Sequence, residues 1–171
     1  LCLGTAHAKE RDSSQAPKKL PVALLNDDNG EERTQISTDP GVMGEVELVR
    51  ERYNDGAVHI ERQTTLDRDG NYVNHGLWKM FSPNGNVQAE GQYHFGRRVG
   101  LWTRWHAAND SKLFGENPSQ EFKAPFMSQV NFTDGVMDGE WIITDANDRK
   151  VCQIALKDGQ RHGLAIFWLP N

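Results

Sequence analysis

A short phrase that recurs along the chain constrains its fold more than any other feature. The phrase Gly-x-x-x-Gly-x-Trp spans residues 96–102 and again residues 135–141. Residues 159–165 repeat it with alanine in place of tryptophan, and residues 70–78 repeat it with two extra residues in the turn. The first glycines include Gly96, Gly135 and Gly159, and the second glycines are Gly76, Gly100, Gly139 and Gly163. Self-similarity of this kind is typical of repeat architectures.

The spacing of the second glycines gives the size of the repeating unit. From 76 to 100 and from 139 to 163 the interval is 24 residues. A degenerate copy at residues 38–46 adds Gly44, and the remaining intervals of 32 and 39 exceed the unit by 8 and 15 residues. Twenty-four residues are too few for two helices with their turns, but they fit two strands of about seven residues. The unit is therefore predicted to be a β-hairpin.

Local sequence supports a hairpin between residues 76 and 95. The sequence Pro-Asn-Gly-Asn at 83–86 favours a tight turn, because Asn and Gly tolerate positive φ. Apolar and polar residues then alternate, and one face receives Val87, Ala89, Gly91, Tyr93 and Phe95. Centring the turn on 84 and 85 sets three cross-strand pairs: Trp78 with Gly91, Met80 with Ala89, and Lys79 with Glu90. This register places the tryptophan on the apolar face and pairs opposite charges.

The repeat tryptophans are the expected structural anchors of the sheet. Trp78, Trp102 and Trp141 occupy the same position in successive units. Because neighbouring strands lie ~4.8 Å apart and these residues fall on alternate strands, we expect the rings to stack about 10 Å apart. The predicted fold class is all-β: a single-layer, elongated antiparallel sheet of repeated β-hairpins.

This repeat pattern resembles the MORN repeat, and more closely the variant in YwqK-like bacterial proteins that are often labelled antitoxin components. The resemblance covers residues 66–171 and, weakly, residues 38–65. The chain departs from the pattern at Ala165, in the turn before Gly76 and in an insert at 106–122. The resemblance implies a hairpin-repeat fold and a role in protein interaction or membrane association.

The sequence divides into three predicted parts. Residues 1–8 are a short apolar stretch ending in Ala-His-Ala, which is interpreted as a signal-peptide remnant and indicates export to the periplasm or the extracellular space. If that interpretation is wrong, the protein is cytoplasmic. Residues 9–37 have mixed charge and little periodicity, as flexible linkers do, and residues 38–171 form the repeat domain. Cleavage after residue 8 leaves Cys152 as the single thiol, expected to be buried.

A second apolar set falls on the face opposite the repeat tryptophans. A single-layer sheet exposes such residues, which then form a surface for a partner or a second copy of the chain. Alternatively, a bulge in each unit switches the alternation and buries them, or the linker or insert covers them. The set is Leu77, Phe81, Leu101, Trp105, Ile142, Leu164, Ile166 and Trp168. The predicted binding residues are Leu77, Phe81, Leu101, Trp105 and Trp168.

Composition and motifs argue against catalysis and bound cofactors. The net charge of −5 gives no basic field for nucleic acid, and no apolar run reaches the ~18 residues of a membrane span. Nucleophile-elbow, zinc-protease, Walker and dinucleotide motifs are absent. Residues 67–71 resemble part of a calcium loop but fall at a repeat turn, and the six histidines lack zinc spacing. We therefore predict no enzyme activity, no cofactor and no metal.

The function predicted from these features is a non-catalytic, exported protein-interaction module. Its expected partner is another protein or a second copy of the chain, and the insert at 106–122 is either functional or merely tolerated. Two alternatives stay open. One is a carbohydrate- or cell-envelope-binding module that stacks sugars on Trp105 and Trp168, and the other is an antitoxin-like inhibitor, which only the resemblance implies.

Overall fold

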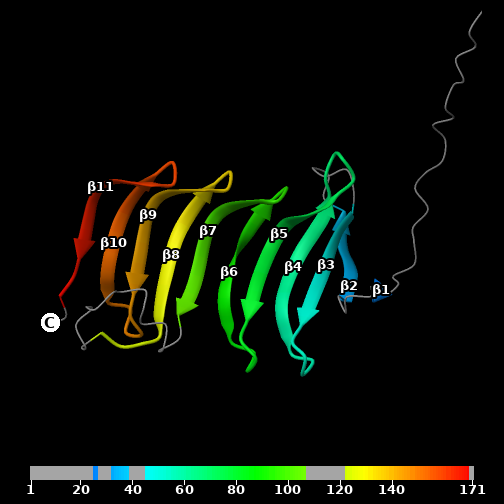
Figure 1. Ribbon diagram of the computed structural model, residues 1–171, viewed down its shortest axis with the longest axis horizontal. Helices are drawn as coiled ribbons and strands as arrows, with labels where there is room; N and C mark the ends of the chain where they lie inside the picture. The colour runs from blue at the N-terminus through cyan, green and yellow to red at the C-terminus, as the bar shows by residue number, and fades with distance from the viewer. Residues whose placement is uncertain (1–24, 27–31, 39–44, 107–121, 170–171) are drawn as a thin grey trace, which may run out of the picture.

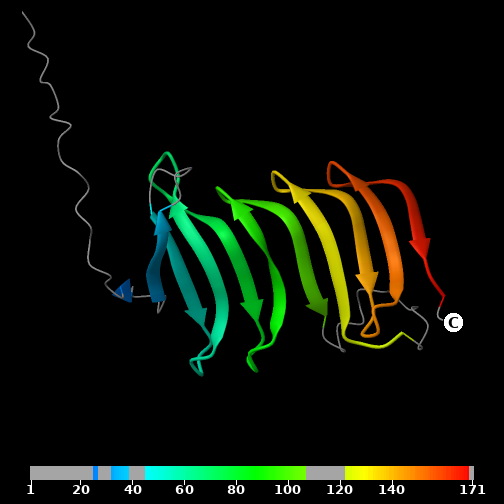
Figure 2. The same ribbon diagram turned by 180° about the vertical axis from the view of Figure 1, so that it is seen from behind.

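The computed structural model of the chain describes residues 25–26, 32–38, 45–106 and 122–169, and every regular element within these ranges is a β-strand. All strands belong to one antiparallel sheet in which each pairs with its neighbours in sequence, from β1 to β11. The sheet is a single curved layer with its first and last strands at opposite ends (Figures 1 and 2). The predicted fold class is confirmed.

Ten strands of seven to ten residues follow a two-residue strand. Their bounds are β1 Leu25–Asn26, β2 Glu32–Thr38, β3 Glu45–Arg52, β4 Val58–Leu66, β5 Tyr72–Phe81, β6 Val87–His94, β7 Arg97–His106, β8 Phe126–Thr133, β9 Val136–Thr144, β10 Lys150–Lys157 and β11 Gln160–Phe167. The sheet thus begins ahead of residue 38, inside the segment interpreted as a linker. The predicted signal remnant 1–8, the earlier part of that linker and residues 107–121 of the insert lie outside the described residues.

The predicted register of the central hairpin is confirmed. Strands β5 and β6 pair Trp78 with Gly91, Met80 with Ala89 and Lys79 with Glu90. The Lys79 Nζ and Glu90 Oε2 atoms lie 3.2 Å apart, so the cross-strand charge pair forms. Alternation of apolar residues and the turn at 84–85 were therefore sufficient to fix which side chains oppose each other.

In three of the repeat phrases the first glycine lies in a two-residue turn. These turns join β6 to β7, β8 to β9 and β10 to β11, and their first residues are Phe95, Asp134 and Asp158, followed by the glycines at 96, 135 and 159. Both residues of each turn have positive φ, between 44° and 86°. This combination defines the type I′ turn, whose twist matches that of antiparallel strands. The turn before β5 is the longer one expected from its two extra residues.

The second glycine lies in a bulge, but this bulge differs from the alternative considered above, which would have switched the alternation and buried the second apolar set. In β7, residues 100–102 together face the single residue Gly91, and Gly100 has a φ of 66°. Glycine adopts this conformation without the steric penalty of a side chain. Because the bulge adds two residues rather than one, alternation is the same on both sides of it. Equivalent bulges contain Gly76, Gly139 and Gly163, with φ of 96°, 88° and 89°.

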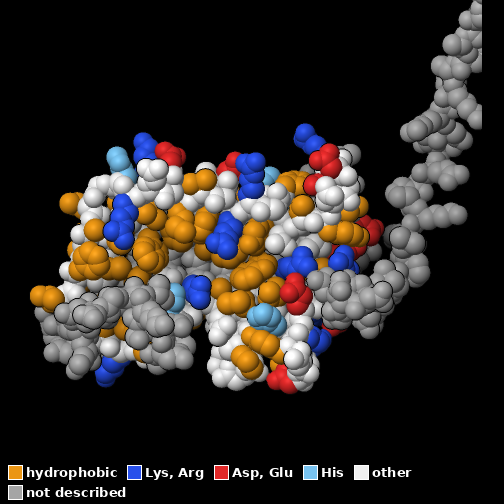
Figure 3. Space-filling model, viewed as in Figure 1, with side chains coloured by type: hydrophobic (Ala, Val, Ile, Leu, Met, Phe, Trp, Pro, Cys, Tyr) orange, Lys and Arg blue, Asp and Glu red, His pale blue; other side chains and the backbone are white. Residues whose placement is uncertain are grey.

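The two main hydrophobic clusters lie on one face of the sheet. We call this the aromatic face, and the other the reverse face. The main cluster consists of Trp78, Tyr93, Trp102, Val130, Phe132, Trp141 and Leu156. A second cluster contains Phe122, Ile143, Val151 and Cys152, against which Phe126, Trp141 and Trp168 pack. Figure 3 looks onto the aromatic face, where hydrophobic side chains form a band across the strands with Lys and Arg side chains along it.

The predicted spacing of the tryptophans is wrong in one respect. The ring centroids of Trp78 and Trp102 are 5.5 Å apart, about half the expected distance. The strand between them presents Gly91 at this level, so no side chain separates the two rings. A Cβ atom added at Gly91 would lie 2.7 Å from Cγ of Trp102 and closer still to the ring carbons Cδ2 and Cε2. The indole of Trp102 therefore lies directly on the glycine backbone.

Candidate binding surfaces

The aromatic cluster is centred on Trp102, which is buried. Its ring makes an edge-to-face contact with Tyr93 at a centroid distance of 5.1 Å and with Phe132 at 6.0 Å. Its indole Nε1 donates a hydrogen bond of 3.2 Å to the backbone oxygen of Gln92. Aromatic pairs in these geometries contribute roughly 0.5–1.5 kcal/mol each beyond burial. These contacts and the indole hydrogen bond fix the position of the Trp102 ring within the hydrophobic core.

A shallow groove of about 290 Å³ crosses strands β7 to β9 beside this cluster. The groove is lined by apolar side chains together with cationic and polar groups. The guanidinium of Arg98 lies 4.6 Å from the centre of the Trp102 ring, and His106 Nε2 shares a hydrogen bond of 2.9 Å with Ser128 Oγ. The lining residues are Arg98, Trp102, Thr103, Arg104, His106, Ser128, Val130, Phe132, Met137 and Trp141.

Large apolar side chains are exposed on the reverse face as well. Leu77 and Leu101 are 49% and 52% exposed. They are aligned with Gln92 and Asn131 across the neighbouring strands, so uncharged polar groups surround them. Trp105 pairs with Met127 on the same face and is half-buried. This part of the reverse face therefore combines apolar side chains with neutral hydrogen-bonding groups, and it is flanked by the charges of Lys79 and Glu90 on β5 and β6 and of Asp138 on β9.

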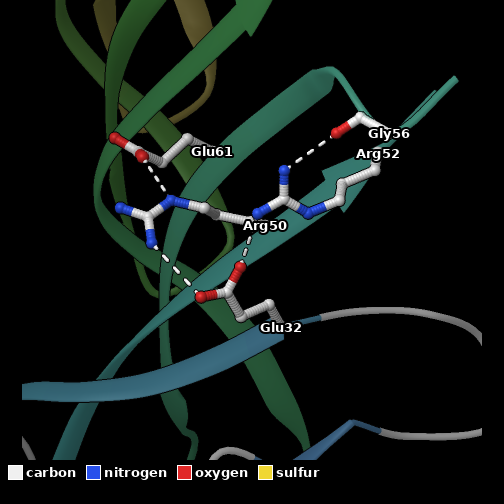
Figure 4. A network of polar contacts seen from close by, with 5 residues as sticks. All are labelled: Glu32, Arg50, Arg52, Gly56 and Glu61. Carbon is white, nitrogen blue, oxygen red and sulfur yellow. Dashed lines mark hydrogen bonds and ion pairs between the residues drawn. The ribbon is translucent and has the colours of Figure 1, made fainter.

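The N-terminal half of the reverse face is instead occupied by a row of alternating charges. Strand register aligns Glu32, Arg50, Glu61, Lys79 and Glu90 on successive strands from β2 to β6. Arg50 Nε lies 2.8 Å from Glu61 Oε2, and Glu32 also accepts a contact of 2.7 Å from Arg52 (Figure 4). Each charge has an opposite neighbour, so this surface offers little uncompensated charge to a partner.

The predicted binding residues are brought together only in part. Leu77, Leu101 and Trp105 share the reverse face, as expected from alternation. Phe81 lies at a register shift next to the loop at 82–86 and is half-buried. Trp168 does not join them: it follows β11, donates its backbone N–H to the carbonyl oxygen of Val151 and packs against the second cluster. Its assignment to the exposed set is corrected, because alternation ends with the strand.

The acidic residues of the turns interact with their own backbone. Asp67 Oδ1 accepts hydrogen bonds of 2.9 Å from the N–H groups of Asp69 and Asn71, and the Asn71 contact above all lowers the pKa of Asp67. The segment 67–71 is thus a capped turn. Among the described residues no group of three His, Cys, Asp or Glu side chains is placed to hold a metal ion.

Asp145 has the corresponding place in the loop between β9 and β10, but it is buried. Desolvation raises its pKa, yet hydrogen bonds from the Arg149 side chain and from the backbone of Lys123, Arg149 and Asn147 outweigh this and lower the pKa well below its usual value. Arg149 Nη2 lies 2.7 Å from Asp145 Oδ2. The backbone N–H of Lys123, which follows the insert, donates a hydrogen bond to Asp145 Oδ2. This bond holds the end of the insert next to the loop between β9 and β10.

Cys152 is a free, buried thiol. Burial raises its pKa, and a favourable interaction with the charge of Arg161 offsets this only in part. A buried thiol with a raised pKa is a weak nucleophile, because thiolate is the reactive form. The residue therefore has the properties of a small hydrophobic side chain within its cluster, as the sequence predicted.

Two features of these surfaces were not found from the sequence. The groove was not predicted because Arg98 and Arg104 were not among the candidate residues, although their parity with Trp102 indicated the aromatic face. The charged row was identified only at its Lys79 and Glu90 step, since the pairings of β2 to β4 had not been worked out. In both cases the alternation of residues along each strand assigns these side chains to a face, but only when the register of each hairpin is known.

No protein-family model, curated protein or solved structure matches this chain. The resemblance to MORN-type repeats accordingly stays a prediction. The described residues include no helix of the length and apolarity that a membrane crossing requires.

Proposed function

We propose that this protein is a non-catalytic protein-interaction module and that a partner protein docks on the reverse face across β5 to β9. The observation that supports this most is that Leu77 and Leu101 are each about half exposed on the same face of the sheet. Apolar side chains of this size, grouped on one face, are typical of interaction sites rather than of inert surface.

The composition around these leucines defines the partner that fits. Gln92, Thr103, Gln129 and Asn131 lie on the same face and supply neutral donors and acceptors. Interfaces of this kind combine apolar anchors with hydrogen bonds and exclude most charges from their centre. The partner surface is therefore expected to be apolar and uncharged, with Trp105 as the anchor that contributes most to binding, since tryptophan is enriched at such positions.

The compensated charge row limits how far the interface extends. From β2 to β6 each carboxylate already has a basic neighbour, so a partner would have to displace those contacts or leave them undisturbed. Such exposed pairs affect orientation and association rate more than affinity. We place the docking area next to the Lys79 and Glu90 end of this row, with Leu77 on the same strand as Lys79. Export, inferred from the apolar start and its Ala-His-Ala sequence, is part of the same proposal.

The test uses matched leucine substitutions. Leu77→Asp and Leu101→Asp are expected to weaken partner binding by at least tenfold, because each leaves a charge facing an apolar interface. Leu169→Asp, at an exposed residue beyond β11, is the control and should bind as the parent does. Partners captured from native lysate and culture medium are identified by mass spectrometry, purified and titrated by calorimetry, with circular dichroism to verify folding.

A different result would move the site to the other face. If folded Leu77→Asp and Leu101→Asp bind the purified partner with unchanged affinity while Arg98→Glu loses it, the groove on the aromatic face is the docking site. A glycan array read by tryptophan fluorescence tests the carbohydrate alternative. A positive array signal that disappears in Trp105→Ala would replace the present proposal.

A further inference from the structure

The last described strand, β11, presents an apolar edge that has a strand on one side only. It pairs with β10 and ends the strand order of the sheet. Leu164 and Phe167 are 77% and 69% exposed, and Ile166 is exposed as well. Unpaired edges with apolar side chains are sites where another strand adds, since the backbone N–H and C=O groups there lack partners within the sheet.

Strand β11 has the same glycine bulge as β5, β7 and β9, so its outer edge corresponds to the edge that those strands pair with the next strand. Those strands contain the same glycine bulge toward their preceding neighbour, and on the other side the glycine is the end residue of their regular pairing with the following strand. The following strand also places a large side chain opposite the glycine in each case. The pairs are Gly76 with Tyr93, Gly100 with Phe132 and Gly139 with Leu156. Gly163 is the equivalent glycine of β11.

The strand that would satisfy this edge is β11 itself. We propose that two copies of the chain associate through antiparallel pairing of their β11 strands, with Ala165 of each copy on the twofold axis. This register places Phe167 of one copy opposite Gly163 of the other, which reproduces the large-residue and glycine pairs within the sheet. It also places Leu164 opposite Ile166. Both kinds of pair occur twice because of the symmetry.

Backbone geometry supports the same register. Trp168 donates its N–H to Val151 of β10 with a distance of 3.0 Å, so its backbone groups point inward. In an antiparallel ladder the inward and outward directions alternate along a strand, and Phe167 and Ala165 therefore direct their N–H and C=O groups to the free edge. A twofold axis perpendicular to the sheet keeps the aromatic faces of both copies on one side. The apolar band of each copy then continues into the other.

The opposite end of the sheet favours a closed pair over a chain of copies. There β1 pairs with part of β2, and the side chains of Glu32 and Arg33 make ion pairs within the sheet. An edge of this kind is protected by charge and by partial coverage. Head-to-tail addition, which would produce fibres, thus finds no second apolar edge among residues 32–34, the side chains described at that end, whereas the isologous contact of β11 closes after two copies.

The test combines oligomeric state with a position-specific crosslink in the full chain. The parent is expected to sediment as a dimer, and Leu164→Lys, at an exposed position, as a folded monomer by circular dichroism. In a Cys2→Ser background, Ala165→Cys should crosslink efficiently with a short bis-maleimide, since the two copies meet at this residue. Gln160→Cys, equally exposed but away from the axis, is the control, and buried Cys152 should not react.

Three outcomes would overturn the proposal. The first is a parent chain that is monomeric at every concentration tested. The second is a dimer in which Gln160→Cys crosslinks as well as Ala165→Cys, and the third is a dimer that Leu164→Lys leaves intact. The proposed dimer uses the edge of β11 and not the docking surface on β5 to β9. The two proposals can therefore fail separately, and Leu101→Asp should remain dimeric.

Discussion

Replacing Gly91 by alanine tests how the repeat packs its aromatic residues. A Cβ atom at this position would lie 2.7 Å from Cγ of Trp102, so the indole has to leave its seat on β6. Overpacking of this kind costs about 1–3 kcal/mol. Displacement also weakens the contacts of Trp102 with Trp78 at 5.5 Å and with Tyr93 at 5.1 Å. Loss of flexibility in the unfolded chain offsets about 0.4–1 kcal/mol, so the net loss should be about 2 kcal/mol.

The sign of the effect should reverse once the ring is removed. A Trp102→Ala background removes the three atoms that lie nearest to the added carbon, and the same substitution should there be neutral or stabilise by up to about 1 kcal/mol. Urea denaturation followed by circular dichroism gives the four free energies of this double-mutant cycle. An equal cost of Gly91→Ala in both backgrounds would refute the reasoning, because the cost would then come from the backbone of β6 and not from Trp102.

Three other predictions concern single positions. Gly100→Ala should cost about 1–2 kcal/mol from backbone strain alone, since its φ is 66° and no atom lies within 4 Å of the added carbon, and Gly100→Asn should cost less. The pKa of Asp145 is lowered in the folded state, so the stability that its carboxylate contributes is complete above pH ~4 and is lost on further acidification. The Asp145→Asn variant should therefore be less stable than the parent at pH 7. Below pH ~4 the stability of the variant should also depend less on pH. The thiol of Cys152 should react with a thiol reagent only at the rate of unfolding, and fast labelling of the native protein would show that its cluster opens locally.

The fold could be predicted because it repeats. Identical spacing of glycine and tryptophan indicated hairpins, and the turn at 84–85 with alternating apolar residues set the pairing of β5 with β6. The turn glycines were also recognisable, since Gly96 and its equivalents follow residues that accept positive φ.

The bulges were harder to predict because a pattern of period two does not show them. A bulge that adds two residues preserves alternation, so the second glycines look like part of a regular strand. The separation of the tryptophans depended on the residue between them. With any side chain at position 91 the rings of Trp78 and Trp102 would be held apart, and the expected distance of about 10 Å followed from strand spacing alone.

The candidate site was predictable for residues inside strands and not for those at strand ends. Leu77 and Leu101 are exposed on the reverse face because alternation within β5 and β7 determines their side. Trp168 lies past the end of β11, where pairing geometry no longer dictates direction, and it packs against the second cluster instead. The groove beside Trp102 required the positions of three strands at once, which a single hairpin does not provide.

The most direct test of this architecture is the proton NMR spectrum of Gly91 in the native protein. An indole ring seated on the glycine backbone shifts the Hα protons strongly upfield, and the account predicts one Gly91 Hα far outside the usual glycine range, with nuclear Overhauser contacts to the rings of Trp102 and Trp78. That shift should disappear in Trp102→Ala. A Gly91 Hα at an ordinary position, without contacts to either indole, would contradict the stacked hairpins on which both proposed surfaces depend.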